Sequence, residues 1–311
     1  MIKIIIGLIV LVAIFTLIPY VFYRMVFYHK PSKQISAYKV PNNPQYQKDK
    51  EKMLALIETL DGLPYESVYI KAEDGVTLFG RYYHQADGAP LHIQMHGYKG
   101  HGIRDFCGGN KIARENGQNT LIVDQRAHGK STGRTITFGV KEQVDCISWI
   151  RYANERFGHD TKIILSGVSM GAATVLLAAA RADLPRNVVG VIADCPYNSA
   201  ERIISKVCED RGYPSHGAFR IIRIGGKMFG KFDVCEANVI NVASRIRIPV
   251  LLIHGEDDRF VPVEMSCAMH RANPGYIQLE TFPNAAHGVS YIEDTDRYTQ
   301  ISETFIQRQI T

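Results

Sequence analysis

The chain of 311 residues lacks the short motifs that mark several large classes of protein. Its six cysteines include no C-x-x-C pair and no metal-like His/Cys cluster, which argues against structural zinc and favours reduced thiols. It has no Walker loop and no Gly-rich dinucleotide loop. The net charge of +5 is modest, so nucleic-acid binding is not indicated. We find no internal repeat and no low-complexity segment.

A short serine motif is the first feature that points to chemistry. Residues 167–171 read Gly-Val-Ser-Met-Gly, between an apolar run and an Ala-rich stretch. This G-x-S-x-G pattern is typical of a nucleophile elbow, a tight turn from a strand into a helix that exposes the hydroxyl of Ser169. Glycine is expected at both ends because a Cβ there would collide with the neighbouring strand or helix. The pattern alone also occurs by chance as a small-residue turn.

An acid and a histidine follow the serine in the order Ser, Asp, His. The apolar run Pro249–His254 predicts a buried parallel strand, and the loop after it carries Asp257 and Asp258. Spacing alone does not separate these two carboxylates. A turn-rich loop further along the chain carries His287. Of the eleven histidines, we choose His287 because it follows the serine and the acid in the expected order.

These residues predict acyl transfer through a serine nucleophile. His287 would take the proton of Ser169 and later return it, while a carboxylate orients the imidazole. The backbone N–H of Met170, which follows the serine, is a predicted oxyanion donor. The second donor comes from the loop after an early strand in enzymes built this way, and here we assign it to Tyr98.

The chain resembles the α/β-hydrolase superfamily. Within it, the likeness is to bacterial membrane-anchored serine hydrolases grouped with the serine aminopeptidase-like and prolyl-oligopeptidase-like esterases. The matching segments lie in order within residues 66–311: His96-Gly97, the D-x-R-G-H-G-x-S-like run 124–131, the motif 167–171, the H-G-x-x-D-x-x-V-P run 254–262, and His287-Gly288. The fourth segment favours Asp258 as the acid. Ala127 departs mildly from the family's usual glycine.

The resemblance implies an α/β fold with a mostly parallel eight-stranded sheet and helices on both faces. Alternating apolar runs predict the same strands: 67–71, 77–84, 91–96, 120–124, 162–166, 189–193, 249–254 and 276–282. Predicted helices are 105–116, 140–157, 170–181, 263–272 and 295–309. The charged residues Asp124 and Arg126 are interpreted as bracing neighbouring loops. A helical cap insertion is expected at about 196–247, with helices over 199–210 and 218–231.

The N-terminal segment carries a second strong signal. Residues Ile4–Tyr23 are almost uninterruptedly apolar and about long enough to cross a hydrocarbon layer of ~30 Å. No Ala-x-Ala-like site follows, so an uncleaved anchor over 1–30 is favoured over a signal peptide. Residues 31–65 are expected to form a tether with a helix over 45–59, before the domain 66–311. Flanking Lys and Arg residues place this domain on the cytoplasmic side of a single-pass cell-membrane protein.

The sequence thus predicts a serine hydrolase that cleaves carboxylic esters or thioesters through an acyl-enzyme. Its expected partners are a small acyl substrate and the membrane, and the mechanism needs no metal or organic cofactor. Two alternatives are a serine peptidase of the aminopeptidase-like kind and a hydrolase-like binding protein without activity. The sequence leaves the acyl chain length and the oligomeric state open.

Overall fold

A central sheet organises the computed structural model, which describes residues 2–30, 36–42 and 44–310. Its strand order is β1-β2-β4-β3-β5-β6-β7-β8, with β2 antiparallel to both neighbours and the other pairs parallel. The strands are β1 (Glu66–Lys71), β2 (Thr77–Tyr83), β3 (Leu91–Met95), β4 (Asn119–Asp124), β5 (Ile163–Val168), β6 (Val188–Asp194), β7 (Val250–Gly255) and β8 (Ile277–Phe282). All eight predicted strands are confirmed, to within two residues at each end.

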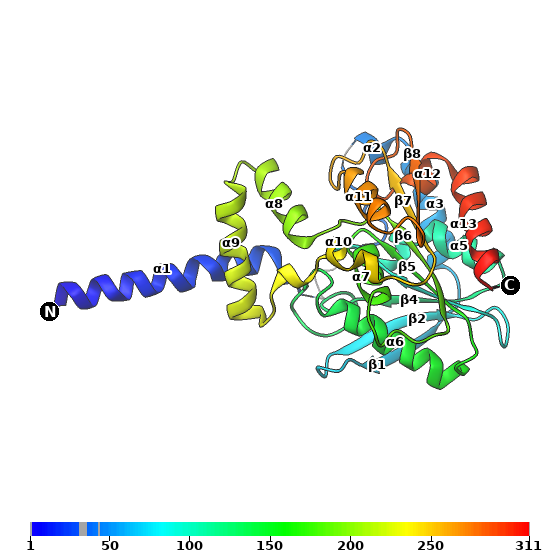
Figure 1. Ribbon diagram of the computed structural model, residues 1–311, viewed down its shortest axis with the longest axis horizontal. Coiled ribbons are helices and arrows are strands. Elements are labelled where there is room, and N and C mark those ends of the chain that lie inside the picture. Colours follow the sequence, from blue (N-terminus) through cyan, green and yellow to red (C-terminus); the bar gives the residue numbers. More distant parts are fainter. Residues whose placement is uncertain (1, 31–35, 43, 311) are drawn as a thin grey trace.

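Helices cover both faces of this sheet (Figure 1). One face carries α6 (Glu142–Phe157), α7 (Met170–Ala179) and α11 (Glu264–Ala272), and the other carries α3 (Lys50–Asp61), α5 (Cys107–Glu115) and α13 (Thr295–Ile310). Shorter helices are α2 (Pro44–Gln47), α4 (Gly102–Asp105), α10 (Val239–Val242) and α12 (Ser290–Glu293). The sheet therefore separates two hydrophobic cores, one around Trp149 of α6 and one around Ile57 of α3.

Two predicted helices are divided in the structure. The helix expected over 105–116 is broken at Phe106 into α4 and α5, and the one expected over 45–59 is split into α2 and α3. Helix α3 packs against α5, and its Ile57 side chain is completely buried. Burial of that side chain ties α3 to the sheet domain.

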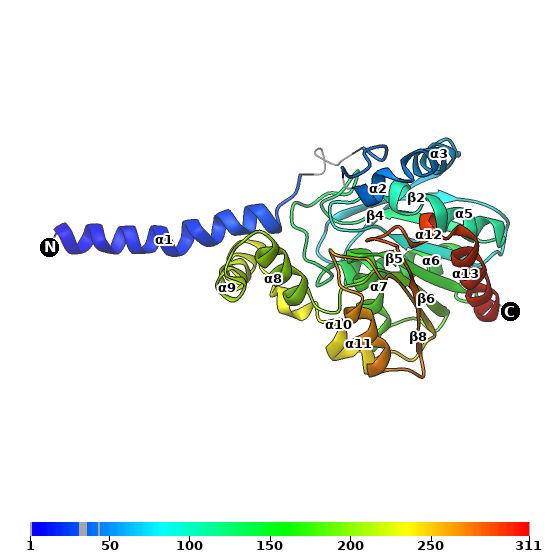
Figure 2. The ribbon, with the colours of Figure 1, turned by 90° about the horizontal axis from the view of Figure 1, so that it is seen from above.

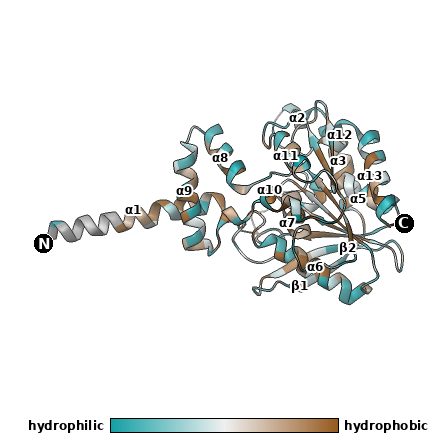
Figure 3. Ribbon diagram, viewed as in Figure 1, coloured by the Kyte–Doolittle hydropathy of each residue, from teal (hydrophilic) through white to brown (hydrophobic). Residues whose placement is uncertain are grey.

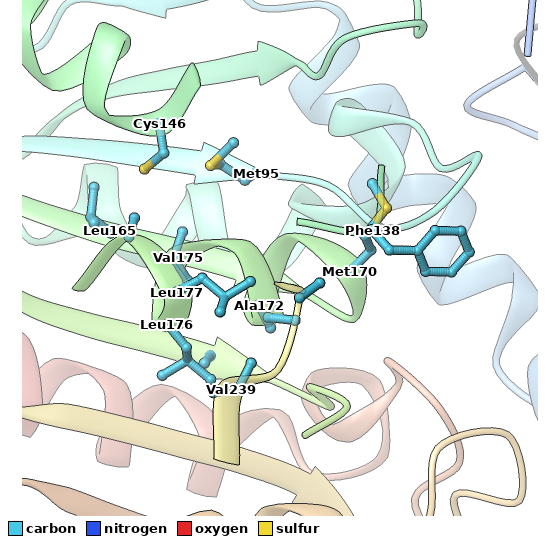
Figure 4. Packing of buried hydrophobic residues seen from close by; sticks show 14 of the residues in the cluster. Met95, Phe138, Cys146, Leu165, Met170, Ala172, Val175, Leu176, Leu177 and Val239 are labelled. Atoms are coloured by element: carbon cyan, nitrogen blue, oxygen red, sulfur yellow. The ribbon is translucent and has the colours of Figure 1, made fainter. Parts of the chain in front are cut away.

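Helix α7 lies in the middle of the larger core and carries the serine motif at its N-terminus. All ten of its residues are buried, which explains its Ala-rich composition. Figure 4 shows Leu176 and Leu177 of this helix among side chains from neighbouring strands, including Leu165 of β5. Small residues let the helix approach the sheet closely, so the position of its first turn is set by a densely packed core.

The insertion after β6 is helical, as predicted. Helices α8 (Ala200–Asp210) and α9 (Ser215–Gly225) are followed by a π-helical turn, η2 (Gly226–Gly230), and by two 3₁₀ turns, η3 (Val234–Glu236) and η4 (Ala243–Arg245). Helices α8 and α9 contact each other and stand apart from the sheet, beside the N-terminal helix (Figures 1 and 2). These two helices and η2 are called the cap below.

The N-terminal helix α1 (Ile2–Val26) packs with its C-terminal end on this cap. The backbones meet so closely that a Cβ on Gly225 would lie 2.4 Å from the carbonyl oxygen of Pro19. The side chains of Tyr23 and Phe27 are buried there. Brown, hydrophobic ribbon accordingly marks the junction of α1 and α9 in Figure 3.

The predicted membrane span over residues 4–23 is not confirmed. Judged on the residues that the structure describes, no helix is long and apolar enough to cross a membrane. Within the predicted span, Pro19 and Tyr23 pack against Gly225 of α9, whereas Phe15 and Leu17 are exposed. The predictions of cell-membrane localisation and of orientation depended on this span and are not confirmed either.

Candidate active site

The serine motif forms a strained turn between β5 and α7. Ser169 has φ 55° and ψ −112°, a conformation that costs energy for a residue with a side chain. A Cβ on Gly171 would lie 1.8 Å from the carbonyl oxygen of Met95, and one on Gly167 would lie 2.3 Å from the backbone of Gly171. Both glycines are therefore required by backbone clearance, as the motif predicts.

The structure brings the three predicted side chains together at the carboxyl ends of the strands. The Oγ of Ser169 lies 2.9 Å from Nε2 of His287, and Nδ1 of the same ring lies 2.6 Å from Oδ2 of Asp258. Nδ1–H then donates to the carboxylate, and Nε2 accepts the serine hydroxyl. The competing Asp257 is exposed and has no bond to the histidine.

The carboxylate of Asp258 is held from several sides. Its Oδ1 accepts the backbone N–H groups of Phe260 and Val261, at 2.9 and 2.8 Å. Its Oδ2 lies 3.2 Å from Nε2 of His254 in addition to the bond from His287. Burial alone would raise the pKa of this carboxyl group, but these hydrogen bonds hold the pKa well below its usual range. Asp258 is thus ionised at neutral pH.

His254 braces the loop that carries the acid. Its Nδ1 lies 2.7 Å from Oγ of Ser266, and its Nε2 lies 2.8 Å from the carbonyl oxygen of Val261. The ring is completely buried. It acts on the site by positioning Asp258.

Met170 begins helix α7 directly after the serine, and Tyr98 follows Gly97, whose added Cβ would lie 3.5 Å from the Cβ of Ser169. The loop carrying Tyr98 is anchored by the buried Asp105, whose carboxylate accepts the N–H of Gly97 at 2.9 Å. Burial would raise the pKa of Asp105, but the charge of Arg104 and the bond from Gly97 lower it. The carboxylate therefore stays charged and holds the loop.

The segment 124–131 supports that same loop. The guanidinium of Arg126 makes two bonds of 2.7 and 2.6 Å to Asp145, and Asp124 pairs with Arg81 at 3.1 Å. The N–H of Lys99, whose φ is 49°, donates to Nε2 of His128 at 3.0 Å. The bracing role predicted for Asp124 and Arg126 agrees with these contacts.

Three neighbours of the site were not predicted from the sequence. The hydroxyl of Tyr46 in α2 donates to the carbonyl oxygen of His287 at 2.6 Å, across 241 residues of chain. The Sγ of Cys195 lies 3.9 Å from Nε2 of His287, and the ring of Phe260 stands edge-on to the imidazole at 5.1 Å. No local pattern around Tyr46 or Cys195 signals these contacts, because both depend on how distant segments pack.

Ligand atoms of Cys195, Asp258 and His287 lie within 4.8 Å of one another, a spacing that a metal ion can bridge. Burial raises the pKa of the Cys195 thiol well above its ordinary value, which disfavours the thiolate that metals bind. Both ring nitrogens of His287 are also engaged, one with Ser169 and one with Asp258. The group is better arranged to move a proton than to hold a metal.

A cavity of about 290 Å³ opens beside Ser169. Its walls come from α1, the cap, and the loop that carries Tyr98. Substrate that reaches the serine would therefore lie between the N-terminal helix and the insertion, as expected for a cap over the site.

The chain matches the model of the α/β-hydrolase fold family over residues 95–212. It is 30% identical over 191 residues to the uncharacterized protein YqkD of Bacillus subtilis, covering 61% of this chain and 62% of YqkD. It is 24% identical over 228 residues to the uncharacterized protein YfhR of Escherichia coli K12, covering 71% and 73% of the two chains. The chain thus spans less than two thirds of the length of YqkD.

Solved structures of esterases share the fold. One is the Pyrococcus furiosus esterase Pf2001, with a TM-score of 0.66, 22% identity, and coverage of 82% of this chain and 94% of the esterase. Another is Est1E from Butyrivibrio proteoclasticus with bound ferulic acid, with a TM-score of 0.62, 23% identity, and coverage of 78% and 99%. Both have the same arrangement of sheet and helices over most of their length.

Proposed function

We propose that this chain is a serine hydrolase of the α/β-hydrolase superfamily that cleaves carboxylic ester or thioester bonds. One observation carries the proposal: a continuous line of hydrogen bonds runs from Ser169 through His287 to Asp258, with spacings of 2.9 and 2.6 Å. The esterases among the structural neighbours support the same reaction class.

The geometry suits a two-step acyl transfer. His287 Nε2 takes the proton of Ser169 as its Oγ attacks the carbonyl carbon, and the ionised Asp258 stabilises the imidazolium. The N–H groups of Tyr98 and Met170 would receive the developing oxyanion, each contributing about 2.7–4 kcal/mol in the transition state. The imidazolium then protonates the departing alcohol or thiol. Water, deprotonated by the same ring, releases the carboxylic acid and restores the serine.

The other two functions lack comparable support. An aminopeptidase-like site needs an acidic group near the substrate amine, whereas the cavity beside Ser169 is lined by the cations Lys99 and Arg211. A binding protein without activity has no need for a serine, a histidine and an acid in hydrogen-bonding order. The two cations therefore disfavour the positively charged amine of an aminopeptidase substrate.

Labelling by a fluorophosphonate probe tests the proposal on the full chain. We expect the wild type to be labelled and to hydrolyse p-nitrophenyl acetate, and Ser169→Ala to lose both properties. Ser148→Ala is the matched control, since among the described residues the Oγ of Ser148 donates to a carbonyl oxygen of its own helix and to no other group. Unlabelled, inactive wild-type protein with an intact thermal transition, or labelling that survives in Ser169→Ala, would contradict the proposal.

A further inference from the structure

Most of the side chains that line the active-site cavity are apolar. From α1 come Phe22, Met25 and Val26, and from the cap come Ile203, Ile204, Val207 and Ile222. Phe138, Tyr197 and Phe260 also line the cavity around Ser169. Such a lining favours a hydrocarbon chain over a polar substrate, because each buried methylene adds hydrophobic binding energy.

Helix α1 is joined directly to the loop that carries the proposed oxyanion donor. The hydroxyl of Tyr98 donates to the carbonyl oxygen of Val26 at 2.7 Å, and Nζ of Lys99 lies 3.4 Å from the carbonyl oxygen of Met25. Both carbonyls belong to the last turn of the helix, where no intrahelical N–H is available. These two contacts fix the position of α1 relative to the loop that carries Tyr98.

Two cations interrupt the apolar lining, Lys99 and Arg211. Among the described residues neither makes an ion pair with an acidic side chain, whereas Arg223 and Lys227 elsewhere in the cap both pair with Asp233. Burial and the charge of Arg211 lower the pKa of Lys99, so the two cations repel each other. Both residues line the cavity beside Ser169, so an anionic group bound there would lie near both charges and offset their repulsion.

Resting on the serine hydrolase function, we propose that the substrates are single-chain anionic amphiphiles. The hydrocarbon chain of the ester lies between α1 and the cap, and a phosphate or carboxylate on the same molecule is held by Lys99 and Arg211. Water adds across the ester bond at Ser169 to give the free carboxylic acid and an alcohol that keeps the anionic group. Helix α1 is then a determinant of specificity.

Three substrates that share one lauroyl chain test the anion site: lauroylglycerol, lauroylglycerol phosphate, and the lauroyl ester of a hydroxycarboxylic acid. We expect kcat/KM to be about tenfold higher for an anionic ester than for the neutral one. The phosphate and carboxylate esters separate the two possible sources of the charge, and preference for either supports the proposal. Arg211→Gln should remove most of this preference, and Arg211→Glu should reverse it.

The matched control for the cation is Arg220→Gln. Arg220 is an exposed cap residue outside the cavity lining, so the preference for anionic esters should not change. Equal kcat/KM for the three substrates in a protein that still reacts with fluorophosphonate would overturn the anion site and leave the hydrolase function standing. Failure of the labelling itself would overturn the hydrolase function.

Chain length tests the hydrocarbon wall. Across neutral p-nitrophenyl esters from acetate to laurate, kcat/KM should rise about fourfold per added methylene until the cavity is filled. Phe22→Ala should lower the ratio of laurate to acetate hydrolysis, while Phe15→Ala, a change on the exposed part of α1, should not. A flat chain-length profile in the wild type would refute the acyl site.

Discussion

The edge of the sheet that carries the serine and the junction of α1 with the cap are built by different means. At the sheet edge, positions are set by backbone clearance: Gly171 faces the carbonyl oxygen of Met95 at a distance that leaves no room for a Cβ. At the junction, positions are set by side chains, with Phe27 packed edge-on against Phe232 and Phe138 at 5.0 and 5.8 Å.

This difference suggests that reaction rate depends on the sheet edge, whereas substrate selectivity depends on the junction of α1 with the cap. Backbone-determined geometry tolerates almost no substitution, so changes at the sheet edge should lower kcat or prevent folding. Side-chain packing adapts to volume-conserving changes, so the junction can be altered to suit other substrates while the chemistry stays intact. Four experiments test whether changes at the sheet edge affect the rate of reaction while changes at the junction affect substrate selectivity.

The largest effect is expected from Gly171→Ala. A methyl group 1.8 Å from the Met95 carbonyl oxygen forces the elbow apart, so we expect activity to fall more than about 10³-fold and stability to drop by several kcal/mol. Gly217→Ala is the control, because nothing lies within 4 Å of its added Cβ in helix α9. Esterase assays and thermal unfolding check both variants. Comparable losses in Gly171→Ala and Gly217→Ala would show that backbone clearance at the sheet edge is not the cause.

Asp258→Asn should lower activity by a similar factor and should also destabilise the fold, because the buried carboxylate accepts several hydrogen bonds. An amide at this position can no longer stabilise the imidazolium and favours the wrong tautomer of His287, an effect of about 10⁴-fold on kcat in a comparable triad. Asp257→Asn, on the exposed neighbour, should retain full activity. A reversed pattern would move the acid role to Asp257.

The free energy of unfolding should depend on pH because Asp194, whose carbonyl oxygen accepts the N–H of Ser169, changes its protonation state. Burial raises the pKa of this carboxyl group to about 6, above its unfolded value, and Tyr298 donates to it at 3.0 Å. The folded state therefore binds more protons, so its contribution is full below about pH 4 and falls as pH rises to about 6, by at most about 3 kcal/mol. In Asp194→Asn, the free energy of unfolding measured in urea should change less between about pH 4 and about pH 6. An unchanged profile would assign the slope to other groups.

The smallest effect is expected from Tyr98→Phe, which keeps the backbone N–H and removes only the bond to Val26. We expect a loss of about 1 kcal/mol in stability and a severalfold rise in KM for long-chain esters, with a smaller change for acetate. Tyr69→Phe, at an exposed hydroxyl, is the control. Equal effects on both esters would mean that α1 does not contact the acyl chain.

Much of this architecture is readable from local patterns. The eight strands follow apolar runs between turn residues, and the Gly-x-Ser-x-Gly turn sets the position of Ser169, because both depend on residues adjacent in the chain. The break at Phe106 and the split of the helix before β1 were missed, since neither interruption contains proline or another strong helix breaker at the break itself.

The N-terminal segment shows why apolar composition alone is ambiguous. A run such as 4–23 satisfies the length rule for a membrane span, but side chains at its end, such as Tyr23, pack on protein. Tyr23 and Phe27 are buried against the cap, an interaction that no pattern within the segment indicates.

The sequence by itself determined the strand and helix succession, the elbow serine and the order of acid and histidine, because these depend on residue type and local spacing. Tertiary structure alone decided that the hydroxyl of Tyr46 reaches the carbonyl oxygen of His287 and that α1 lines the cavity beside Ser169. The physical reason is that hydrogen bonds and apolar contacts form between atoms close in space, and residues far apart in the chain become neighbours only when the sheet and its helices pack.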